Sequence, residues 1–443
     1  MPIITDTETL ADFCRRVGRS SYITVDTEFM RENTFWPHLC VVQVAGEDDA
    51  CVIDALAEGI DLAPLYELMA DTRVLKVFHA ARQDLEIFYN AMQKLPAPLF
   101  DTQVAAMVCG FGESAGYETL VRQLAGKQID KSSRFTDWSH RPLSDKQIAY
   151  ALADVTHLRP VYEKLANMLA KNGRTAWLDE EMAILTEPRT YAQPSEEAWK
   201  RIKGKPTNRR ALAVLMKIAA WRDREAKRRN IPRSRVLRDE ALVEIAHHAP
   251  QTVDDLARVR GMGRRMAEGQ SGAELLEAVT TGVAIPDKDL PVIERPDALP
   301  RGLGPITDLL KVLLKAKCEE NQVATKLIAT ADDVEKIAAF GDKADVAALH
   351  GWRRAVFGED ALALRAGKLA LVVSKGNVEL VEFEDEAQHA VSRRVLRPEV
   401  HREVAELNFC HDQRAFSSPG KVMPSHGERK SKLRKSWASF TGS

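Results

Sequence analysis

Four acidic residues of this chain have the residue type and setting of metal ligands. Asp26 and Glu28 lie two residues apart in an apolar run typical of a strand, so their side chains project from one face. Asp84 and Asp154 lie in helical patterns, and Tyr150 precedes Asp154 by one helical turn. If the four carboxylates converge, they provide the donor set with which two Mg²⁺ or Mn²⁺ ions hold the attacking and leaving oxygens of a phosphodiester. The sequence then predicts cleavage of phosphodiester bonds, with the Tyr150 hydroxyl orienting the attacking water.

Each of these residues also has an ordinary structural explanation. The strand could end at Asp26 and leave its two acids in water, and Asp84 taken alone is expected to be an exposed helix residue. The tyrosine and aspartate of the second helix, taken alone, would be a common surface pair. Two nearby polar residues are expected to be structural: Asp101 as the N-cap of the helix that follows it, and His79 as a hydrogen-bonded residue of the core. The predicted metal site therefore depends on the acids coming together.

Length, charge and cysteine content indicate a multidomain protein of the cytoplasm. The 443 residues correspond to roughly three domains at about 150 residues each. No run approaches the ~18 apolar residues of a membrane helix, and the first ten residues lack a secretory signal pattern. The six cysteines are far apart, without a C-x-x-C pair or a histidine cluster, so neither a disulfide framework nor a zinc site is indicated. We expect a cytoplasmic protein with reduced thiols and no membrane contact.

The basic residues are concentrated in one segment, although the formal net charge is only −1. Residues 200–238 contain fifteen Lys and Arg but only two acidic residues. Such a segment would attract a phosphate backbone whatever its base sequence, with a steep dependence on salt. The alternative is a solvated helix face. The candidates for contact with nucleic acid are Lys217, Arg222, Arg224, Lys227, Arg228 and Arg229.

The first 190 residues alternate between strand and helix patterns, which predicts an α/β layer domain. Short β runs occur at 21–25, 40–44, 50–53 and 74–78, and helical patterns follow from residues 62, 81 and 102. The helix that carries Tyr150 and Asp154 is expected to begin at Ser144, because Ser144 and Gln147 have the spacing of a capping box.

Composition shifts divide the chain further. The predicted domains are the α/β domain at 1–190, an all-α domain at 207–285 and a second all-α domain at 305–370, with linkers at 191–206 and 286–304. Each all-α domain begins with a long amphipathic helix, so the two resemble degenerate copies. The remaining segment, 371–443, is a largely unassigned extension. A short hairpin is expected between 369 and 383, and the tail, rich in Ser, Lys, Arg and Gly, is expected to be disordered.

Three motifs, in this order, closely resemble those of a known nuclease family. They are Val25-Asp-Thr-Glu-Phe-Met30 with residues 34–43, His79-Ala-Ala-Arg-Gln-Asp-Leu-Glu86, and Tyr150-Ala-Leu-Ala-Asp-Val155, with Arg134-Phe-Thr-Asp-Trp-Ser-His-Arg-Pro-Leu-Ser144 as a further similar stretch. The family is bacterial ribonuclease D, of the DEDD exonucleases with tyrosine in the third motif. The resemblance covers nearly all of residues 1–190. It implies a ribonuclease-H-like mixed sheet flanked by helices, with Asp26, Glu28, Asp84 and Asp154 as metal ligands and Tyr150 positioning the water.

The resemblance continues into the helical domains. Trp221-Arg-Asp-Arg-Glu-Ala226 is similar to the HRDC-type nucleic-acid-binding module, and Gly351-Trp-Arg-Arg-Ala-Val-Phe-Gly358 looks like the second such module of the family. The family implies a 3′–5′ exoribonuclease that trims structured RNA, such as tRNA precursors with 3′ extensions, and releases nucleoside 5′-monophosphates. Phe29 and Met30 directly follow the acidic pair and are candidates for contact with the terminal bases. Packing in the core is the alternative.

Two other functions are compatible with the residues alone. The first is a DNA exonuclease of the repair or proofreading type that uses the same chemistry, because no visible residue reads a 2′-hydroxyl. The other is a non-enzymatic RNA-binding protein with a decayed site. Loss of any of the five site residues would favour this non-enzymatic function, and all five residues are present. The function expected first is therefore metal-dependent 3′–5′ trimming of RNA.

Overall fold

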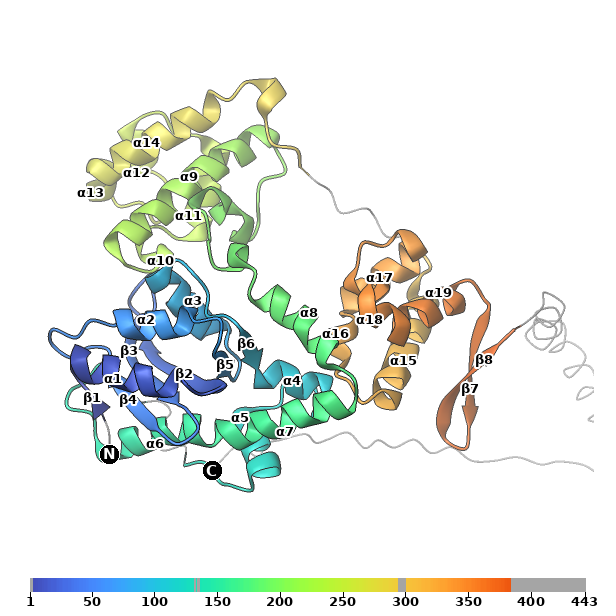
Figure 1. Cartoon of the computed structure of the whole chain (residues 1–443). Coiled ribbons are helices and arrows are strands. Elements are labelled where there is room, and N and C mark those ends of the chain that lie inside the picture. Colours follow the sequence, from blue (N-terminus) through green and yellow to red (C-terminus); the bar gives the residue numbers. More distant parts are fainter. Residues whose placement is uncertain (1–2, 131–132, 134–135, 294–299, 384–443) are drawn as a thin grey trace, which may run out of the picture. The chain divides into compact units, whose positions relative to one another are not determined.

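The computed structural model describes residues 3–130, 133, 136–293 and 300–383 (Figure 1). Nearly all of them belong to one unit that ends at Glu379. The tail from Ser417 that is predicted to be disordered, Cys410, and Arg134 and Phe135 of the family-like stretch lie outside the described residues. None of the helices in the described part of the chain is long and apolar enough to cross a membrane.

The first 190 residues contain a mixed six-stranded sheet, which confirms the predicted fold class. Its strands are β1 (Ile3–Ile4), β2 (Tyr22–Met30), β3 (His38–Ala45), β4 (Ala50–Asp54), β5 (Leu75–Phe78) and β6 (Leu99–Asp101). Their order is β1-β4-β3-β2-β5-β6. The β2–β3 and β3–β4 pairs are antiparallel, and the other three pairs are parallel. Sequence analysis missed β1 and β6, because strands of two and three residues are too short to show a period.

Strand β2 is longer than predicted, and its length decides where its acids lie. It continues through Asp26 and Glu28 to Met30 and pairs with β3 over this whole stretch. Ile23 and Val25 are fully buried in the core, so the two-residue period places the two acids on the opposite face of the strand. The alternative in which the strand ends at Asp26 is therefore wrong.

In the described part of the first 190 residues, eight α-helices accompany this sheet. They are α1 (Thr7–Val17), α2 (Ala63–Ala70), α3 (Arg82–Met92), α4 (Thr102–Val108), α5 (Tyr117–Leu120), α6 (Asp145–Thr156), α7 (Leu158–Lys171) and α8 (Thr175–Leu185). Two predicted caps are confirmed. Asp101 accepts hydrogen bonds from the first backbone N–H groups of α4, and Ser144 forms the predicted capping box with Gln147 at the start of α6.

The first helical region follows a 3₁₀-helix, Ser195–Arg201, that lies within the predicted linker. Its helices are α9 (Arg209–Arg229), α10 (Arg233–Val236), α11 (Asp239–His248), α12 (Val253–Ala257), α13 (Arg264–Ala267) and α14 (Gln270–Val283). The long helix α9 ends at Asn230, whose φ of 46° is a left-handed conformation that asparagine tolerates. The Asn230 side-chain oxygen accepts hydrogen bonds from the backbone N–H groups of Phe35 and Trp36, each at 3.1 Å. This contact ties the loop after β2 to the helical core, into which Phe35 packs.

The second helical region begins after residue 300. It contains α15 (Gly304–Glu320), α16 (Thr325–Ile328), α17 (Ala331–Phe340), α18 (Gly351–Arg353) and α19 (Glu359–Arg365). The predicted hairpin is present as β7 (Leu369–Ser374) and β8 (Asn377–Glu382), which form a two-stranded sheet. The division of the chain into domains at the predicted boundaries stays a prediction.

Candidate active site

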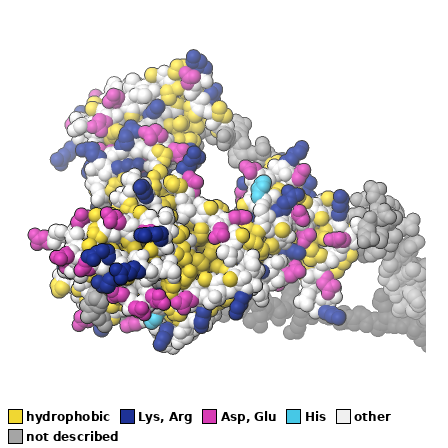
Figure 2. Space-filling model, viewed as in Figure 1, with side chains coloured by type: hydrophobic (Ala, Val, Ile, Leu, Met, Phe, Trp, Pro, Cys, Tyr) yellow, Lys and Arg dark blue, Asp and Glu magenta, His cyan; other side chains and the backbone are white. Residues whose placement is uncertain are grey.

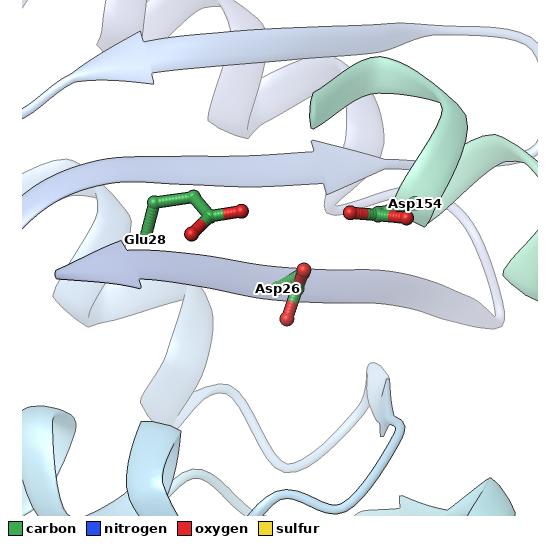
Figure 3. A group of neighbouring side chains, drawn as sticks. All are labelled: Asp26, Glu28 and Asp154. Carbon is green, nitrogen blue, oxygen red and sulfur yellow. The ribbon is translucent and has the colours of Figure 1, made fainter. Parts of the chain in front are cut away.

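Three of the four predicted acidic residues form one group of carboxylates. Asp26 and Glu28 on β2 and Asp154 on α6 each offer a carboxylate oxygen, and these oxygens all lie within 4.8 Å of one another. Figure 3 shows the three side chains gathered between the strand and the helix. The fold thus brings together residues that are far apart in the sequence, at a spacing that suits ligands of a divalent ion.

Helix α6 positions Tyr150 and Asp154 on one face. It packs against β2, β3 and β4, and Ala151 and Val155 are fully buried. Burial, and next the charge of the Asp154 carboxylate, raise the pKa of the Tyr150 hydroxyl, because residues four apart on a helix are neighbours on one face. The tyrosine therefore lies directly at the carboxylate group.

The segment before α6 is fixed against the sheet by Arg141. Its guanidinium donates two hydrogen bonds to the Asp54 carboxylate, at 2.7 and 2.6 Å, and one to the Cys40 carbonyl oxygen at 2.9 Å. This arginine holds Trp138, which is only 2% exposed, with its ring 6.1 Å from the ring of Tyr150. Residues 136–144, which belong to the family-like stretch, thus limit where the Tyr150 ring can lie.

Asp84 lies beside the carboxylate group but not within it. It is 6% exposed and accepts a hydrogen bond from the hydroxyl of Thr27, the residue between the two acids of β2. The expectation that Asp84 alone would be an exposed helix residue is wrong, because α3 packs this face onto the sheet. The three mutually close oxygens belong to Asp26, Glu28 and Asp154, while Asp84 is near enough to Asp26 to interact with its charge.

The electrostatics of the site fit a cation. Burial, and next the charge of Asp154, raise the pKa of Asp26 to about 8. Burial, and next the charge of Asp26, raise the pKa of Asp84 well above its usual value. A bound cation would offset both effects by favouring the ionised carboxylates. Hard carboxylate oxygens are also the ligands that Mg²⁺ and Mn²⁺ prefer, so the residues present fit divalent ions.

A cavity of about 280 Å³ adjoins the carboxylates and reveals a residue that sequence analysis missed. Asp26, Asp154 and Tyr150 line it together with His79 and Tyr117. The Tyr117 hydroxyl donates a hydrogen bond to the backbone carbonyl oxygen of Asp154. His79 lies within hydrogen-bond distance of the Thr102 hydroxyl, at 3.0 Å, which agrees with its expected structural role. Tyr117 is outside the quoted motifs, so no sequence signal pointed to it.

The two residues after the acidic pair differ in their surroundings. Met30 packs against the core cluster that contains Trp138 and Cys40, which favours the packing alternative for this side chain. Phe29 is half-buried at the end of β2. Contact between Phe29 and a terminal base stays a prediction.

Many Lys and Arg of the basic segment are paired with acids, some inside the segment and some outside it. Arg222 is 4% exposed and bonds to Asp239 at 2.6 Å, so it is buried and paired; its contact with nucleic acid stays a prediction. Lys227 is also turned inward, with its ammonium 2.8 Å from Asp223. On the face shown in Figure 2, Lys and Arg side chains are interspersed with Asp and Glu side chains. The exposed candidates are Lys217, Arg224, Arg228 and Arg229, the last three with an acidic partner.

The fold and the site together define a class of protein. A mixed sheet with two acids on an interior strand, a third on a neighbouring helix and a tyrosine one turn before it is the arrangement of a ribonuclease-H-like 3′–5′ exonuclease. Residues 1–170 match the family model described as 3′-5′ exonuclease, and residues 211–279 match the model of the HRDC domain.

Similar proteins identify the family. Ribonuclease D of Granulibacter bethesdensis is 52% identical over 380 residues, which are 86% of this chain and 96% of that protein. Ribonuclease D of Nitrobacter hamburgensis is 52% identical over 86% of this chain and 100% of its own length. The crystal structure of Escherichia coli RNase D, described as an exoribonuclease involved in structured RNA processing, has a TM-score of 0.70 at 30% identity, over 82% of this chain and 98% of that one. The chain belongs to the ribonuclease D family and is a 3′–5′ exoribonuclease. The DNA exonuclease alternative is not favoured.

Proposed function

We propose that this chain trims the 3′ ends of structured RNA, such as tRNA precursors with 3′ extensions, in a reaction that requires two Mg²⁺ or Mn²⁺ ions. Asp26, Glu28 and Asp154 would hold these ions, with Asp84 as the fourth carboxylate. The observation that supports this is the group of three carboxylate oxygens within 4.8 Å. A location in the cytoplasm stays a prediction.

The chemistry divides between the ions and the side chains. When bound, the ions would supply the charge that activates the attacking water and stabilises the departing 3′-oxygen. Burial, and next the charges of Asp154 and Glu28, raise the pKa of Tyr150, so its hydroxyl keeps its proton at neutral pH. A protonated hydroxyl orients a water molecule through a hydrogen bond and leaves the removal of its proton to other groups. Departure of the 3′-oxygen leaves the phosphate on the released nucleotide, a nucleoside 5′-monophosphate.

Replacing Tyr150 with Phe is expected to lower kcat by about 10²-fold with little change in KM, because the water loses its orientation while the RNA keeps its contacts. The ring retains its packing near Trp138, so the fold is expected to be unchanged. Steady-state kinetics on a short single-stranded RNA measure the effect. Tyr162→Phe is the matched control, since Tyr162 does not line the cavity. Equal kcat values for the two variants would contradict the role of Tyr150.

Excess chelator is expected to stop the shortening of a 5′-labelled tRNA precursor, and Mg²⁺ or Mn²⁺ to restore it. Metal binding must displace the proton of the Asp26 carboxyl group, whose pKa is about 8. The metal concentration that gives half-maximal activity should therefore fall as the pH rises toward about 8, and level off above it. Gels should show stepwise loss of single nucleotides. Internal fragments, or shortening that persists in chelator, would contradict the proposal.

We propose that the helical regions bind the part of the RNA that lies outside its single-stranded 3′ end. The HRDC match covers most of α9, all of α10 to α13 and most of α14. Lys217, Arg224, Arg228 and Arg229 are exposed along α9 and remain candidates for phosphate contact. In this arrangement the exonuclease region takes the single-stranded 3′ end while the helical region holds the remainder of the RNA.

A further inference from the structure

A second cavity, of about 640 Å³, lies beside the loop that follows β2. Five arginines contribute to its lining: Arg31, Arg201, Arg222, Arg233 and Arg238. We call it the arginine cleft. It is lined by the exonuclease region, by the 3₁₀-helix before α9 and by helices α9 to α11, so residues from separate parts of the sequence build it.

Three of these arginines are held in place by carboxylates. Arg31 makes two hydrogen bonds to Glu86, at 2.7 and 2.8 Å. Arg233 bonds to the buried Asp223 at 2.5 Å, and Arg222 bonds to Asp239 as described above. These pairs fix the positions of the guanidinium groups, so the walls of the cleft are preorganised.

The other two arginines have no such partner. The guanidinium groups of Arg201 and Arg238 make no hydrogen bond or ion pair with any residue in the part of the chain that the structure describes, and both residues are exposed. Partial burial, and next the charge of Arg233, lower the pKa of Arg201, while the charges of Asp223, Glu86 and Glu197 act in the opposite direction. Glu32 and Glu240 also line the cleft. Asp239 is the third acid of the lining, and Glu86 and Asp223, outside the lining, neutralise Arg31 and Arg233. The positive charge that a ligand could use therefore lies at Arg201 and Arg238, which have no carboxylate partner among the described residues.

Two of the arginines that line the cleft also have a buried guanidinium N–H group without an acceptor. These groups are Nε of Arg222, a residue that is 4% exposed, and Nη2 of Arg233; neither finds a hydrogen-bond acceptor among the described residues. A buried donor without an acceptor is unfavourable, and a phosphate oxygen is a strong acceptor for a guanidinium group. The donors that a ligand in the cleft can reach are the exposed guanidinium groups of Arg201 and Arg238.

The cleft also lies close to the carboxylates along the chain. Arg31 is three residues beyond Glu28, roughly 10 Å at the rise of a strand. The loop that continues from Arg31 is fixed by the hydrogen bonds from Phe35 and Trp36 to Asn230. An RNA strand whose 3′ end lies at the carboxylates would therefore need to extend only a short distance to reach the cleft.

We propose that the arginine cleft binds a phosphodiester group of the RNA strand whose 3′ end lies at the carboxylates. This inference rests on the proposed function and adds a specific site to it. A strand bound at both places is held in register for removal of its last nucleotide. An RNA too short to span both sites gains nothing from the cleft.

The test compares the full-length double variant Arg201→Gln/Arg238→Gln with the control Arg260→Gln/Arg265→Gln. The control removes the same charge from exposed positions of the same helical region that do not line the cleft. Affinity is measured by fluorescence anisotropy in chelator, for a dinucleotide and for a single-stranded RNA of about ten nucleotides, within the range of known single-strand sites. Turnover is measured separately.

The cleft variant is expected to bind the longer RNA about tenfold more weakly, with the slope of log affinity against log salt reduced by about 0.7 for each phosphate that the variant no longer neutralises. Dinucleotide affinity and kcat should not change. Equal weakening for both RNAs, or for the control variant, overturns the proposal, as does an unchanged affinity for the longer RNA. Inorganic phosphate that alters dinucleotide turnover in the wild type, but not in the variant, would instead assign the cleft to free phosphate. A wild type that binds RNA but does not degrade it contradicts the proposed function alone.

Discussion

Asp26→Asn or Asp154→Asn is expected to abolish RNA hydrolysis without unfolding the protein. Each substitution keeps the side-chain shape but removes the charge with which the residue would hold a divalent ion. The rate of hydrolysis should fall by more than the roughly 10–100-fold typical when a residue that only hydrogen-bonds to a metal ligand is replaced. The rate at which a 5′-labelled RNA is shortened at saturating Mg²⁺ measures it.

The stability of these variants provides a second, independent readout. In chelator, the carboxylates of Asp26 and Asp154 raise the free energy of the folded state, because each is buried near the other. Removing one of them should leave the Tm of the metal-free protein unchanged or raise it. Asp145→Asn, at an exposed position in the first turn of the same helix, is the control for both measurements. Full activity in Asp26→Asn would refute the assignment of the site.

Asp223→Ala is expected to lower the free energy of unfolding of the first helical region by about 3 kcal/mol, the lower end of the range for a broken buried ion pair. Asp223 is 1% exposed. It accepts hydrogen bonds from Arg233 at 2.5 Å and Ser195 at 2.7 Å, and its carboxylate lies 2.8 Å from the Lys227 ammonium. The variant leaves two cations without their anion. Both are partly exposed, so water limits the loss.

The pH dependence of this effect has a definite sign. Burial would raise the pKa of Asp223, but hydrogen bonds from Lys227 and Ser195 and the charge of Arg233 lower it below its usual value. A lowered folded-state pKa contributes stability above the unfolded pKa of about 3.9, and that contribution is lost as the pH falls through the folded value. The difference between wild type and variant should be constant near neutral pH and shrink below about pH 4.

Urea unfolding followed by circular dichroism tests both statements. The matched control is Asp254→Ala, because Asp254 is 72% exposed and pairs with an equally exposed Arg264. Such a surface pair contributes about 0–1 kcal/mol. A loss for Asp223→Ala no larger than for this control would show that the buried carboxylate does not hold the region together.

The basic segment shows where reasoning from the sequence was incomplete. Within residues 200–238 the Lys and Arg outnumber the acids so strongly that a basic surface was the natural expectation. In the structure, Arg210 pairs with Asp287, Arg222 with Asp239 and Arg224 with Glu196. All three acids lie outside the segment. A count of charges along the chain cannot include partners that only folding brings near.

Asp84 and Tyr117 show the same limit at the site itself. The helical pattern around Asp84 favoured exposure, yet the contact with Thr27 buries it beside Asp26. Nothing near Tyr117 in the sequence indicates that its hydroxyl would reach the Asp154 backbone. Both contacts join elements that pack together only in the complete fold.

The sequence by itself determined the local features and predicted the acidic residues of the candidate site. The capping box of Ser144 and Gln147, the N-cap at Asp101 and the shared face of Asp26 and Glu28 depend on hydrogen bonds and periods within a few residues, so they can be predicted from spacing. The tertiary structure alone decided which carboxylates approach within 4.8 Å, which arginines are neutralised and where an arginine cleft forms. Those outcomes depend on the packing of distant elements, where burial and charge pairing act between residues that the sequence does not place together.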